Sequence, residues 1–322
     1  MAIVCRSFAK INLGLRIGAA RPDGFHDLLT VYQTIALHDV IRVSVERGSG
    51  IEIKCSDPRV PRDESNTCYR IVERAMAGIG AKGRVVIDID KRLPVQGGLG
   101  GASANAVATL LGLERALRKK FRAQQKLRIA AEVGSDLPLF LVGGTVLGVG
   151  RGEQVYPLPD LSPIHCVVVT PEIGVSTPKA FAEWDRRNVD AKLTASASSD
   201  RMNELGRGLS AWLSEPYSSA PSSFTGRGRA ENPLLWLVRA GIENDFEQVV
   251  FPEYPELCEG KRALARAGAK YASLSGSGST LYGLFGSKAA AEWAAVRLRK
   301  QGWAAQATVT LTRRGYWSRI FD

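Results

Sequence analysis

Cysteine is scarce in this sequence, and its pattern argues against a cross-linked fold. The 322 residues include five cysteines, which are odd in number, widely spaced and without a Cys-x-x-Cys pair. Disulfide frameworks and zinc sites depend on paired or closely spaced cysteines. We therefore expect reduced, buried thiols, as in a protein of the cytoplasm, rather than a disulfide scaffold or a zinc site.

Long apolar runs are also missing. The longest one, residues 137–150, is interrupted by glycine, and it is shorter than the roughly 20 residues that cross a bilayer. Residues 1–10 contain no extended apolar stretch of the kind found in a signal peptide. These absences predict a soluble cytoplasmic protein with no membrane partner.

Common nucleotide-binding and nucleic-acid-binding signatures are absent as well. No glycine-rich loop is followed by the Lys-Ser or Lys-Thr pair of a Walker A motif, and no Gly-x-Gly-x-x-Gly run has an acidic residue at the usual distance. The net charge of +11 favours a polyanionic partner, but the basic residues are scattered, without an RNP-like aromatic cluster or zinc-finger spacing. Charge alone leaves nucleic acid, a membrane surface and a small phosphorylated substrate open.

The composition that is present is that of an ordinary globular protein. Hydrophobic residues make up 45% and charged residues 23%, and the length suits two domains better than one core. Residues 157–163 include three prolines and form a plausible linker. We expect domains at 1–158 and 159–322, with a variable insertion at about 188–231.

Hydrophobic patterning predicts a mixed α+β chain that opens with strands. Strands are predicted at residues 9–17, 30–37, 39–45, 51–55, 85–91, 166–170, 271–274, 281–285 and 304–311. Helices are predicted at residues 68–77, 103–117, 124–133, 202–213 and 289–301, and residues 139–158 have a strand-like pattern.

Residues 94–105, Pro-Val-Gln-Gly-Gly-Leu-Gly-Gly-Ala-Ser-Ala-Asn, are the stretch around which the chain is organised. Four glycines allow left-handed backbone and close approach of N–H groups to an anion. An Ala- and Leu-rich helix follows, with Ser103 placed to cap its start, so its dipole would favour phosphate. The alternative is a flexible turn between a strand and a helix, and the capped helix makes the phosphate interpretation the better one.

A lysine and an aspartate are candidates for phosphoryl-transfer chemistry. Lys10 lies in an otherwise apolar strand, where a charge needs a partner, although a lysine on the solvent side of an edge strand fits the sequence equally well. Asp136 lies between Gly134 and Pro138 beside an apolar segment, and its alternative is an Asx-turn or a helix cap.

Two further segments have candidate binding roles. Phe25 and His26 follow a Pro-Asp-Gly turn and suit stacking on and hydrogen bonding to a base, although a lone Phe-His pair is more often simple packing. Residues 275–280, Ser-Gly-Ser-Gly-Ser-Thr, offer a second set of N–H groups to phosphate, and the alternative is a tight connection between strands.

Taken together, these segments resemble the motifs of the GHMP small-molecule kinases. The resemblance rests on Ala-Lys-Ile-Asn at 9–12, the loop from Pro94, and Leu-Ser-Gly-Ser-Gly at 274–278. Residues 7–13, 21–26, 93–101, 134–138 and 243–247 are similar to the branch that acts on 4-diphosphocytidyl-2-C-methyl-D-erythritol. The likeness covers nearly the whole chain except 188–231.

The resemblance implies a fold and an activity. The fold would be α+β with two domains, a ribosomal-protein-like N-terminal domain and a ferredoxin-like C-terminal domain, with the active site in the cleft between them. The activity would be ATP-dependent phosphorylation of the 2-hydroxyl of that substrate in the non-mevalonate route to isoprenoid precursors, with ATP as co-substrate and Mg²⁺. No nucleic-acid partner is expected.

The resemblance also implies roles for individual residues. Asp136 would be the general base, and Lys10 would stabilise that carboxylate and the developing alkoxide. The residues implied to bind the substrate are Asn12, Phe25, His26, Phe181, Ser275 and Gly276. Those implied to bind ATP are Pro94, Val95, Gln96, Gly97, Gly98, Leu99, Gly100, Gly101, Ala102, Ser103 and Ala104.

Two departures from the family pattern limit what carries over. Ala102 and Ala104 flank Ser103 where the family usually has a glycine and a pair of serines, so a serine ligand for magnesium is not expected and no metal ligand is assigned. Ser279 stands where proline is frequent. Alternatives are another GHMP kinase, acting on homoserine or mevalonate, and a nucleic-acid-binding module without catalysis.

Overall fold

The computed structural model describes residues 2–190, 202–207, 210 and 242–321, with side chains described as far as 187 in the first range. Most of the expected insertion at 188–231 lies outside these residues. Of the helix predicted at 202–213, residues 202–207 are helical and most of the remainder lies outside the described chain. Within the described residues, no helix combines the length and apolar character needed to cross a bilayer.

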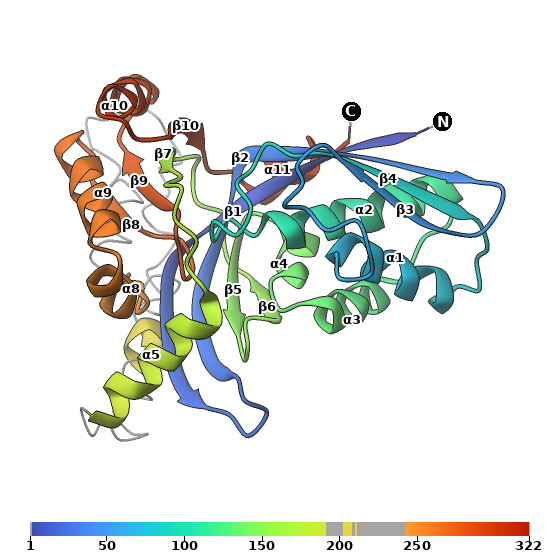
Figure 1. The fold of residues 1–322 in the computed structure, drawn as a ribbon, viewed down its shortest axis with the longest axis horizontal. Coiled ribbons are helices and arrows are strands. Elements are labelled where there is room, and N and C mark those ends of the chain that lie inside the picture. The colour runs from blue at the N-terminus through green and yellow to red at the C-terminus, as the bar shows by residue number, and fades with distance from the viewer. Residues whose placement is uncertain (1, 191–201, 208–209, 211–241, 322) are drawn as a thin grey trace, which may run out of the picture.

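A six-stranded sheet forms the first half of the molecule (Figure 1). Its strands are β1 (Ile3–Ala20), β2 (His26–Glu46), β3 (Gly50–Cys55), β4 (Arg84–Asp90), β5 (Thr145–Val149) and β6 (Gln154–Pro157). The order is β3-β4-β2-β5-β6, with β1 paired to β2, and only β3 and β4 run parallel.

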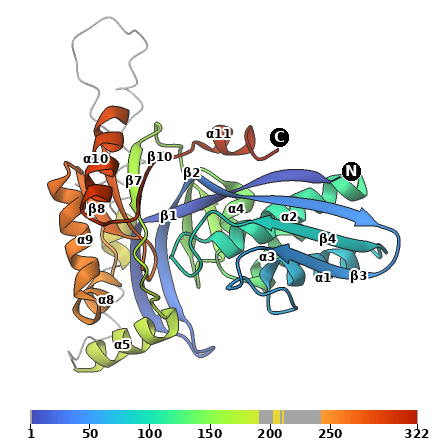
Figure 2. The ribbon, with the colours of Figure 1, turned by 45° about the horizontal axis from the view of Figure 1, so that its top comes forward.

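The strands predicted at 30–37 and 39–45 are one continuous strand, β2, rather than two. The reason is its long antiparallel pairing with β1, in which Phe8 opposes His38 and Lys10 opposes Thr34 across a register shift. Each strand supplies backbone partners for the other throughout this length. The β1–β2 pair therefore extends past the edge of its own sheet toward the second half of the chain, as Figure 2 shows.

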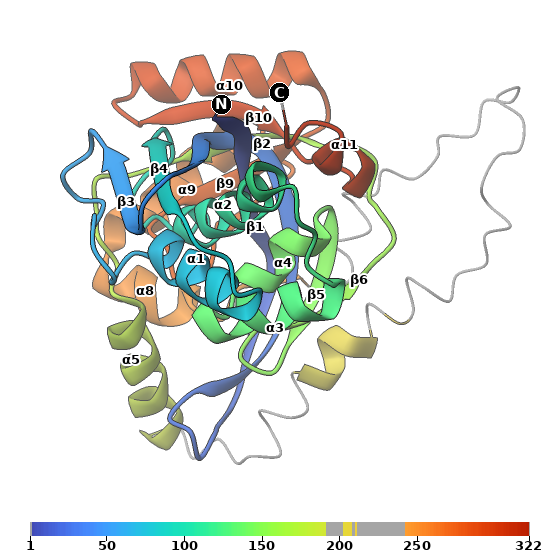
Figure 3. The ribbon, with the colours of Figure 1, turned by 90° about the vertical axis from the view of Figure 1, so that its right-hand side faces the viewer.

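Four helices cover one face of this sheet (Figure 3). They are α1 (Thr67–Gly78), α2 (Gly101–Leu117), α3 (Ala123–Val133) and α4 (Leu137–Val142). Residues 104–114 of α2 are all buried, because this Ala- and Leu-rich helix packs against α1, α4 and the sheet. A helix that is apolar all round is stable only in such a position.

The strand-like pattern expected over 139–158 is partly wrong. Residues 137–142 form α4, with Pro138 in its first turn, where the missing N–H costs nothing. The helix ends at Gly143 and Gly144, whose φ angles of 71° and 72° suit glycine. A short apolar run does not by itself distinguish a buried helix from a strand.

A four-stranded antiparallel sheet forms the second half, in the order β10-β7-β9-β8. Its elements are β7 (His165–Val169), α5 (Thr177–Asp190), α8 (Glu247–Glu253), α9 (Pro255–Arg266), β8 (Tyr271–Leu274), β9 (Leu281–Phe285), α10 (Lys288–Lys300) and β10 (Ala305–Val309). The strands predicted at 271–274 and 281–285 are confirmed with their bounds, and the α+β expectation is confirmed. Helices α9 and α10 both contact this sheet (Figure 1).

The two sheets share a core, and the C-terminal end of the chain returns to the first sheet. Ile11, Leu99, Cys166 and Tyr282 belong to one buried cluster that joins elements of both halves. The last helix, α11 (Arg313–Trp317), is followed by a backbone hydrogen bond from Arg6 to the carbonyl of residue 320, 2.7 Å long. The change of sheet falls between β6 and β7, and the domain boundary near 158 stays an interpretation.

Candidate functional site

A cavity of about 590 Å³ lies where three segments distant in the sequence meet. They are the middle of β1, the loop before α2 and the loop between β8 and β9. Most of the predicted site residues line it: Lys10, Asn12, Phe25, His26, residues 94–103, Asp136, Phe181 and Gly276. Ala104 and Ser275, which are both buried, do not line it.

The glycine loop has the left-handed backbone that its composition predicts. The φ angles of Gly98 and Gly100 are 75° and 68°. A Cβ on Gly98 would lie 2.2 Å from the carbonyl oxygen of Ser275, and one on Gly100 would lie 3.1 Å from Cγ of Lys10. Only glycine permits both the backbone angle and these close approaches.

Hydrogen bonds tie this loop to the other two segments. The N–H of Lys10 donates to the carbonyl of Leu99 at 3.0 Å. The hydroxyl of Ser275 donates to the carbonyl of Gly98 at 2.9 Å, and the N–H of Thr280 donates to that of Gly97 at 3.2 Å. The loop conformation therefore fixes how the three segments are placed around the cavity.

Ser103 does not cap α2, contrary to the prediction. The helix begins at Gly101, its N-cap is Gly100, and no side chain accepts a hydrogen bond there. Ser103 instead lies in the first turn and lines the cavity. The first N–H groups of a helix have no partners within it, so this end of α2, with the positive end of its dipole, suits an anion in the cavity.

Substituting Gly98 by alanine should destabilise the fold by about 2 to 4 kcal/mol and weaken the binding of a phosphate-containing ligand in the cavity, since a strained φ and a clash with backbone act together. Thermal unfolding and calorimetric titration with such a ligand measure the two effects. Gly302→Ala is the matched control, because Gly302 has φ 90° but no atom within 4 Å of a new Cβ. The Gly302→Ala variant should lose about 1 kcal/mol of stability. Equal losses of stability in the two variants would contradict the role assigned to the close approach of Gly98 to Ser275.

Lys10 is buried, which excludes the solvent-facing alternative. Its Nζ donates to Oδ1 of Asn12 at 2.6 Å and lies 3.5 Å from Oδ2 of Asp136. Burial lowers the pKa of Lys10 below its ordinary value of 10.5, and the charge of Asp136 opposes that shift. A buried ammonium beside a single carboxylate is a feature of functional sites more than of stable cores.

Asp136 occupies the N-cap position of α4, but its side chain does not cap the helix. Its side chain accepts no capping hydrogen bond and is about one third exposed, toward the cavity. The hydroxyl of Tyr32 donates to its Oδ1 at 3.0 Å. Burial, and then the charge of Asp136, raise the pKa of Tyr32 well above its usual value, so Tyr32 stays a donor.

Tyr32 is a site residue that the sequence did not reveal. It lies directly opposite Asn12 in the β1–β2 pair. The register of that pair, which no local pattern specifies, places Tyr32 beside Lys10, with Nζ 5.6 Å from the ring centroid.

Asn12 orients Lys10 in this structure. Its Nδ2 donates to Oγ1 of Thr30 at 2.8 Å, which leaves Oδ1 facing the ammonium. The hydroxyl of Tyr282 donates to the carbonyl of Asn12 at 2.8 Å and so joins β9 to β1. The expected contact of Asn12 with substrate stays a prediction.

An aromatic group forms another part of the cavity. Phe25 is 49% exposed, and the guanidinium of Arg151 lies 4.9 Å from its ring centroid. The ring of Phe181 is stacked on His26 at 4.9 Å between centroids and makes an edge contact with Phe246. The sequence assigned no role to Arg151 or Phe246: Arg151 lies outside the recognised motifs, and the motif at 243–247 does not indicate that its Phe246 contacts Phe181.

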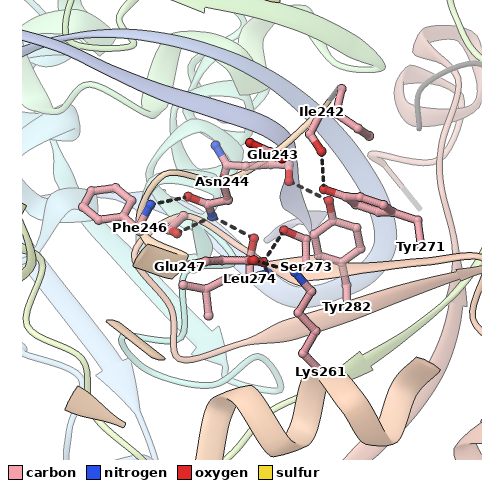
Figure 4. A network of polar contacts seen from close by, with 12 residues as sticks. Ile242, Glu243, Asn244, Phe246, Glu247, Lys261, Tyr271, Ser273, Leu274 and Tyr282 are labelled. Atoms are coloured by element: carbon pink, nitrogen blue, oxygen red, sulfur yellow. Dashed lines mark hydrogen bonds and ion pairs between the residues drawn. The ribbon is translucent and has the colours of Figure 1, made fainter. Parts of the chain in front are cut away.

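The segment at 243–247 supports the late glycine loop (Figure 4). Nδ2 of Asn244 donates to the carbonyls of Leu274 and Gly276, at 2.9 and 2.7 Å. Glu247 accepts from the hydroxyl of Ser273 at 2.7 Å and forms an ion pair with Lys261. These contacts hold Gly276 at φ 58°, where an added Cβ would be 3.5 Å from Nζ of Lys10.

The cavity also extends toward α1, where the sequence gave no candidates. Asn66 and Cys68 line it there, together with Lys91 and Asn105. Nζ of Lys91 donates to Oδ2 of Asp39 at 2.7 Å. Among the described residues, the buried Oδ1 of Asn105 has no hydrogen-bond partner. Asn105 therefore contributes an unpaired amide oxygen to this part of the structure.

Comparison with known proteins places these features in context. The GHMP kinases N terminal domain matches residues 66–144, and the GHMP kinases C terminal domain matches residues 234–302. Two proteins named 4-diphosphocytidyl-2-C-methyl-D-erythritol kinase, from Solibacter usitatus and Acaryochloris marina, are 38% and 33% identical. Those matches cover 87% and 92% of this chain and 80% and 92% of theirs.

Solved structures agree with the sequence comparison. A 4-(cytidine 5'-diphospho)-2C-methyl-D-erythritol kinase crystal structure is 28% identical, with a TM-score of 0.70 over 96% of this chain and 99% of that chain. A homoserine kinase from Cytophaga hutchinsonii is 20% identical, with a TM-score of 0.71 over 97% and 95%. The second likeness concerns the fold alone.

Proposed function

Since this chain belongs to the 4-diphosphocytidyl-2-C-methyl-D-erythritol kinases of the GHMP kinase superfamily, we propose how its cavity performs their reaction. The protein is an ATP-dependent small-molecule kinase that phosphorylates this cytidine diphosphate derivative in isoprenoid biosynthesis. The observation that carries the proposal is the buried Lys10 next to Asp136, at the wall formed by the glycine loop.

The phosphates of ATP are assigned to the glycine loop and the start of α2. Residues 97–101 line the cavity with little side-chain bulk, and the first turn of α2 directs unpaired N–H groups and a positive dipole end toward it. The adenosine is assigned to the part of the cavity toward α1, where Asn66 and Asn105 provide polar groups.

The reacting alcohol is assigned to the space beside Lys10 and Asp136. The 2-hydroxyl oxygen attacks the γ-phosphorus while its proton passes to Oδ2 of Asp136, and the bond from the γ-phosphorus to the bridging oxygen of ADP breaks. The ammonium of Lys10, fixed by Asn12, offsets the negative charge that develops on the attacking oxygen. Positioning and charge account for most of the catalysis in such transfers.

Tyr32 has a positioning role in this scheme. Its hydroxyl occupies Oδ1 of Asp136, so Oδ2, the oxygen nearer Lys10, is the one left to accept the proton. A carboxylate held by two different partners keeps one orientation, which is the requirement for proton transfer in a short hydrogen bond.

The magnesium ion that such kinases require would enter this cavity bound to the phosphates of ATP. Among the described residues there is no cluster of three or more His, Cys, Asp or Glu side chains. Mg²⁺ commonly keeps several waters and binds phosphate oxygens with few protein ligands. When bound, the ion would neutralise phosphate charge, and Asp136 carries the one carboxylate among the described residues that line this cavity.

The cytosine is assigned to the aromatic group around Phe25 and His26. Phe25 offers an exposed ring face at the cavity, and stacking of a base on an aromatic ring is worth about 1 to 3 kcal/mol. The contact of Phe181 with the other face of the base stays part of this proposal, because one face of its ring already lies on His26.

Phe25→Ala should raise the Michaelis constant for the cytidylyl substrate about tenfold, from the loss of that stacking, and leave the Michaelis constant for ATP unchanged. Steady-state kinetics with each substrate varied in turn measures both. Tyr156→Ala is the matched control, since Tyr156 is 53% exposed on β6 and does not line the cavity. An unchanged constant for the cytidylyl substrate in Phe25→Ala would place the base elsewhere.

The substrate assignment is tested by measuring ADP release with 4-diphosphocytidyl-2-C-methyl-D-erythritol, homoserine and mevalonate in parallel. We expect turnover with the first and none above background with the others. Comparable turnover with homoserine or mevalonate would favour another GHMP kinase, and salt-sensitive RNA binding without any ADP release would favour the nucleic-acid-binding alternative.

A further inference from the structure

Three residues spaced four apart on helix α5 contact the cavity wall: Thr177 and Phe181 line the cavity, and the half-exposed Asp185 contacts His26 from outside the lining. The hydroxyls of Thr177 and Ser277 are 2.7 Å apart, the ring of Phe181 is stacked on His26, and Oδ1 of Asp185 is 2.6 Å from Nε2 of His26. Residues at this spacing lie on the same side of a helix. Two of the three contacts are with the imidazole of His26.

These two contacts determine how the imidazole is oriented. Phe181 lies nearly parallel to the ring, with 11° between the planes, and so restricts its tilt. Asp185 restricts rotation within that plane, because turning the ring over would move Nε2 away from the carboxylate. The ring is 93% buried, by its exposed fraction of 7%, and it lines the cavity.

The partner of Nε2 also decides which nitrogen carries the proton. An ionised carboxylate can only accept a hydrogen bond, so Nε2 must be the donor. A neutral imidazole has a single N–H group, which leaves Nδ1 as an acceptor. Among the described residues, the side-chain hydrogen bond of His26 is the one at Nε2, which leaves Nδ1 of this cavity residue to a ligand.

We propose that Asp185 is a specificity-determining residue that acts through His26. By holding the proton on Nε2, it makes Nδ1 an acceptor for the 4-amino group of cytosine. Uracil carries an oxygen at that position, so two acceptors would face each other and the contact would be repulsive. Asp185 therefore selects cytidine over uridine nucleotides. This inference rests on the proposed function, in which His26 lies beside the base.

The proposed preference for cytosine depends on hydrogen-bond polarity, which gives enzymes strong selection between similar substrates. A site that supplies a hydrogen-bond partner to one substrate group rejects an analogue with the opposite polarity, because buried polar atoms are left unpaired. Without Asp185 the imidazole can place its proton on either nitrogen, and Nδ1 then becomes a donor for the 4-oxo group of uracil. The loss of Asp185 should therefore change the ratio of the affinities for cytidine and uridine nucleotides more than it changes the affinity for cytidine nucleotides.

The test compares the dissociation constants of CDP and UDP by calorimetry at about pH 8, where free histidine is neutral. The wild-type protein should bind CDP at least tenfold more tightly than UDP. Asp185→Ala should reduce this ratio about tenfold, and Asp185→Asn, which keeps an acceptor oxygen, should reduce it less. Glu183→Ala is the control on the same helix, because Glu183 pairs with Arg186 and Arg187 and does not line the cavity; its ratio should equal that of the wild type.

Nitrogen-15 chemical shifts of His26 give an independent readout. The wild type should show the Nε2–H tautomer, and Asp185→Ala should show a mixture of both tautomers. An equal loss of affinity for CDP and UDP, a ratio unchanged by Asp185→Ala, or a wild type without preference would each overturn the inference. Because these measurements need no turnover, a failure of phosphoryl transfer with the cytidylyl substrate would count against the proposed function alone.

Discussion

Asp136→Asn should lower kcat about 10³-fold or more and leave the dissociation constant for ATP unchanged. The amide keeps the volume of the side chain but has no oxygen that accepts a full proton, and general-base catalysis contributes about 10² to 10⁴ in rate. The loss of the negative charge beside Lys10 adds to the effect. Steady-state kinetics and calorimetry with a non-hydrolysable ATP analogue measure the two quantities.

Asp88→Asn is the matched control for this substitution. Asp88 lies on β4, is about half exposed, and faces Arg42 at 3.6 Å. Ion pairs of this kind contribute little to stability, and Asp88 does not line the cavity. Its kcat should equal that of the wild type. Asp136→Asn enzyme with more than a tenth of wild-type kcat would refute the assignment of Asp136 as the base.

Lys10→Met should lower kcat about 10² to 10³-fold, since methionine fills similar space without the charge that offsets the developing alkoxide. The Michaelis constant for ATP should change much less, because the backbone N–H groups assigned to its phosphates belong to the glycine loop and to α2. Lys126→Met provides the control: Lys126 pairs with Glu114 at 3.0 Å outside the cavity. Equal kcat values in the Lys10 and Lys126 variants would contradict the proposal.

The pH dependence of the wild type should carry the signature of Lys10. Its pKa in the folded protein is lowered from 10.5 by burial, so the ammonium is lost, and kcat falls, as pH rises through a value below 10.5. This alkaline decrease should be absent from the residual activity of Lys10→Met. A wild-type kcat that stays constant up to pH 10.5 would argue that Lys10 is not needed in its charged form.

The same pKa shift predicts the effect of Lys10 on stability. Between the lowered folded pKa and 10.5 the unfolded chain binds more protons than the folded one, so stability rises with pH across that window. Below the window the charged Lys10 costs stability in full. Lys10→Met should therefore not have a lower melting temperature at pH 7, which separates its loss of activity from a loss of folding.

The glycine loop shows which local features the sequence predicted correctly and which it did not. Four glycines before an Ala- and Leu-rich helix predicted an anion-binding turn, and the φ angles of Gly98 and Gly100 have the values that require glycine. The start of α2 was misplaced, because the helix begins at Gly101, with Gly100 rather than Ser103 at the N-cap position and no capping side chain. Ser103 had the right residue type for a cap, but tertiary contacts of the loop set the first helical residue.

The chemistry around Lys10 depended on contacts that no local pattern encodes. The sequence allowed a solvent-facing lysine, and burial by the loop at 97–100 excluded it. Tyr32 reaches Asp136 because of the β1–β2 register, and Asp185 reaches His26 across 159 positions of the chain. Such pairs are brought together only by tertiary packing.

By itself the sequence determined many of the strands and helices, the glycine turns and the family resemblance, because backbone conformation and hydrophobic periodicity are properties of neighbouring residues. The tertiary structure decided which charges are buried, which oxygen of Asp136 stays available and which nitrogen of His26 is left to accept a hydrogen bond. Those properties depend on distance and desolvation, and both are set by residues that lie far apart along the chain.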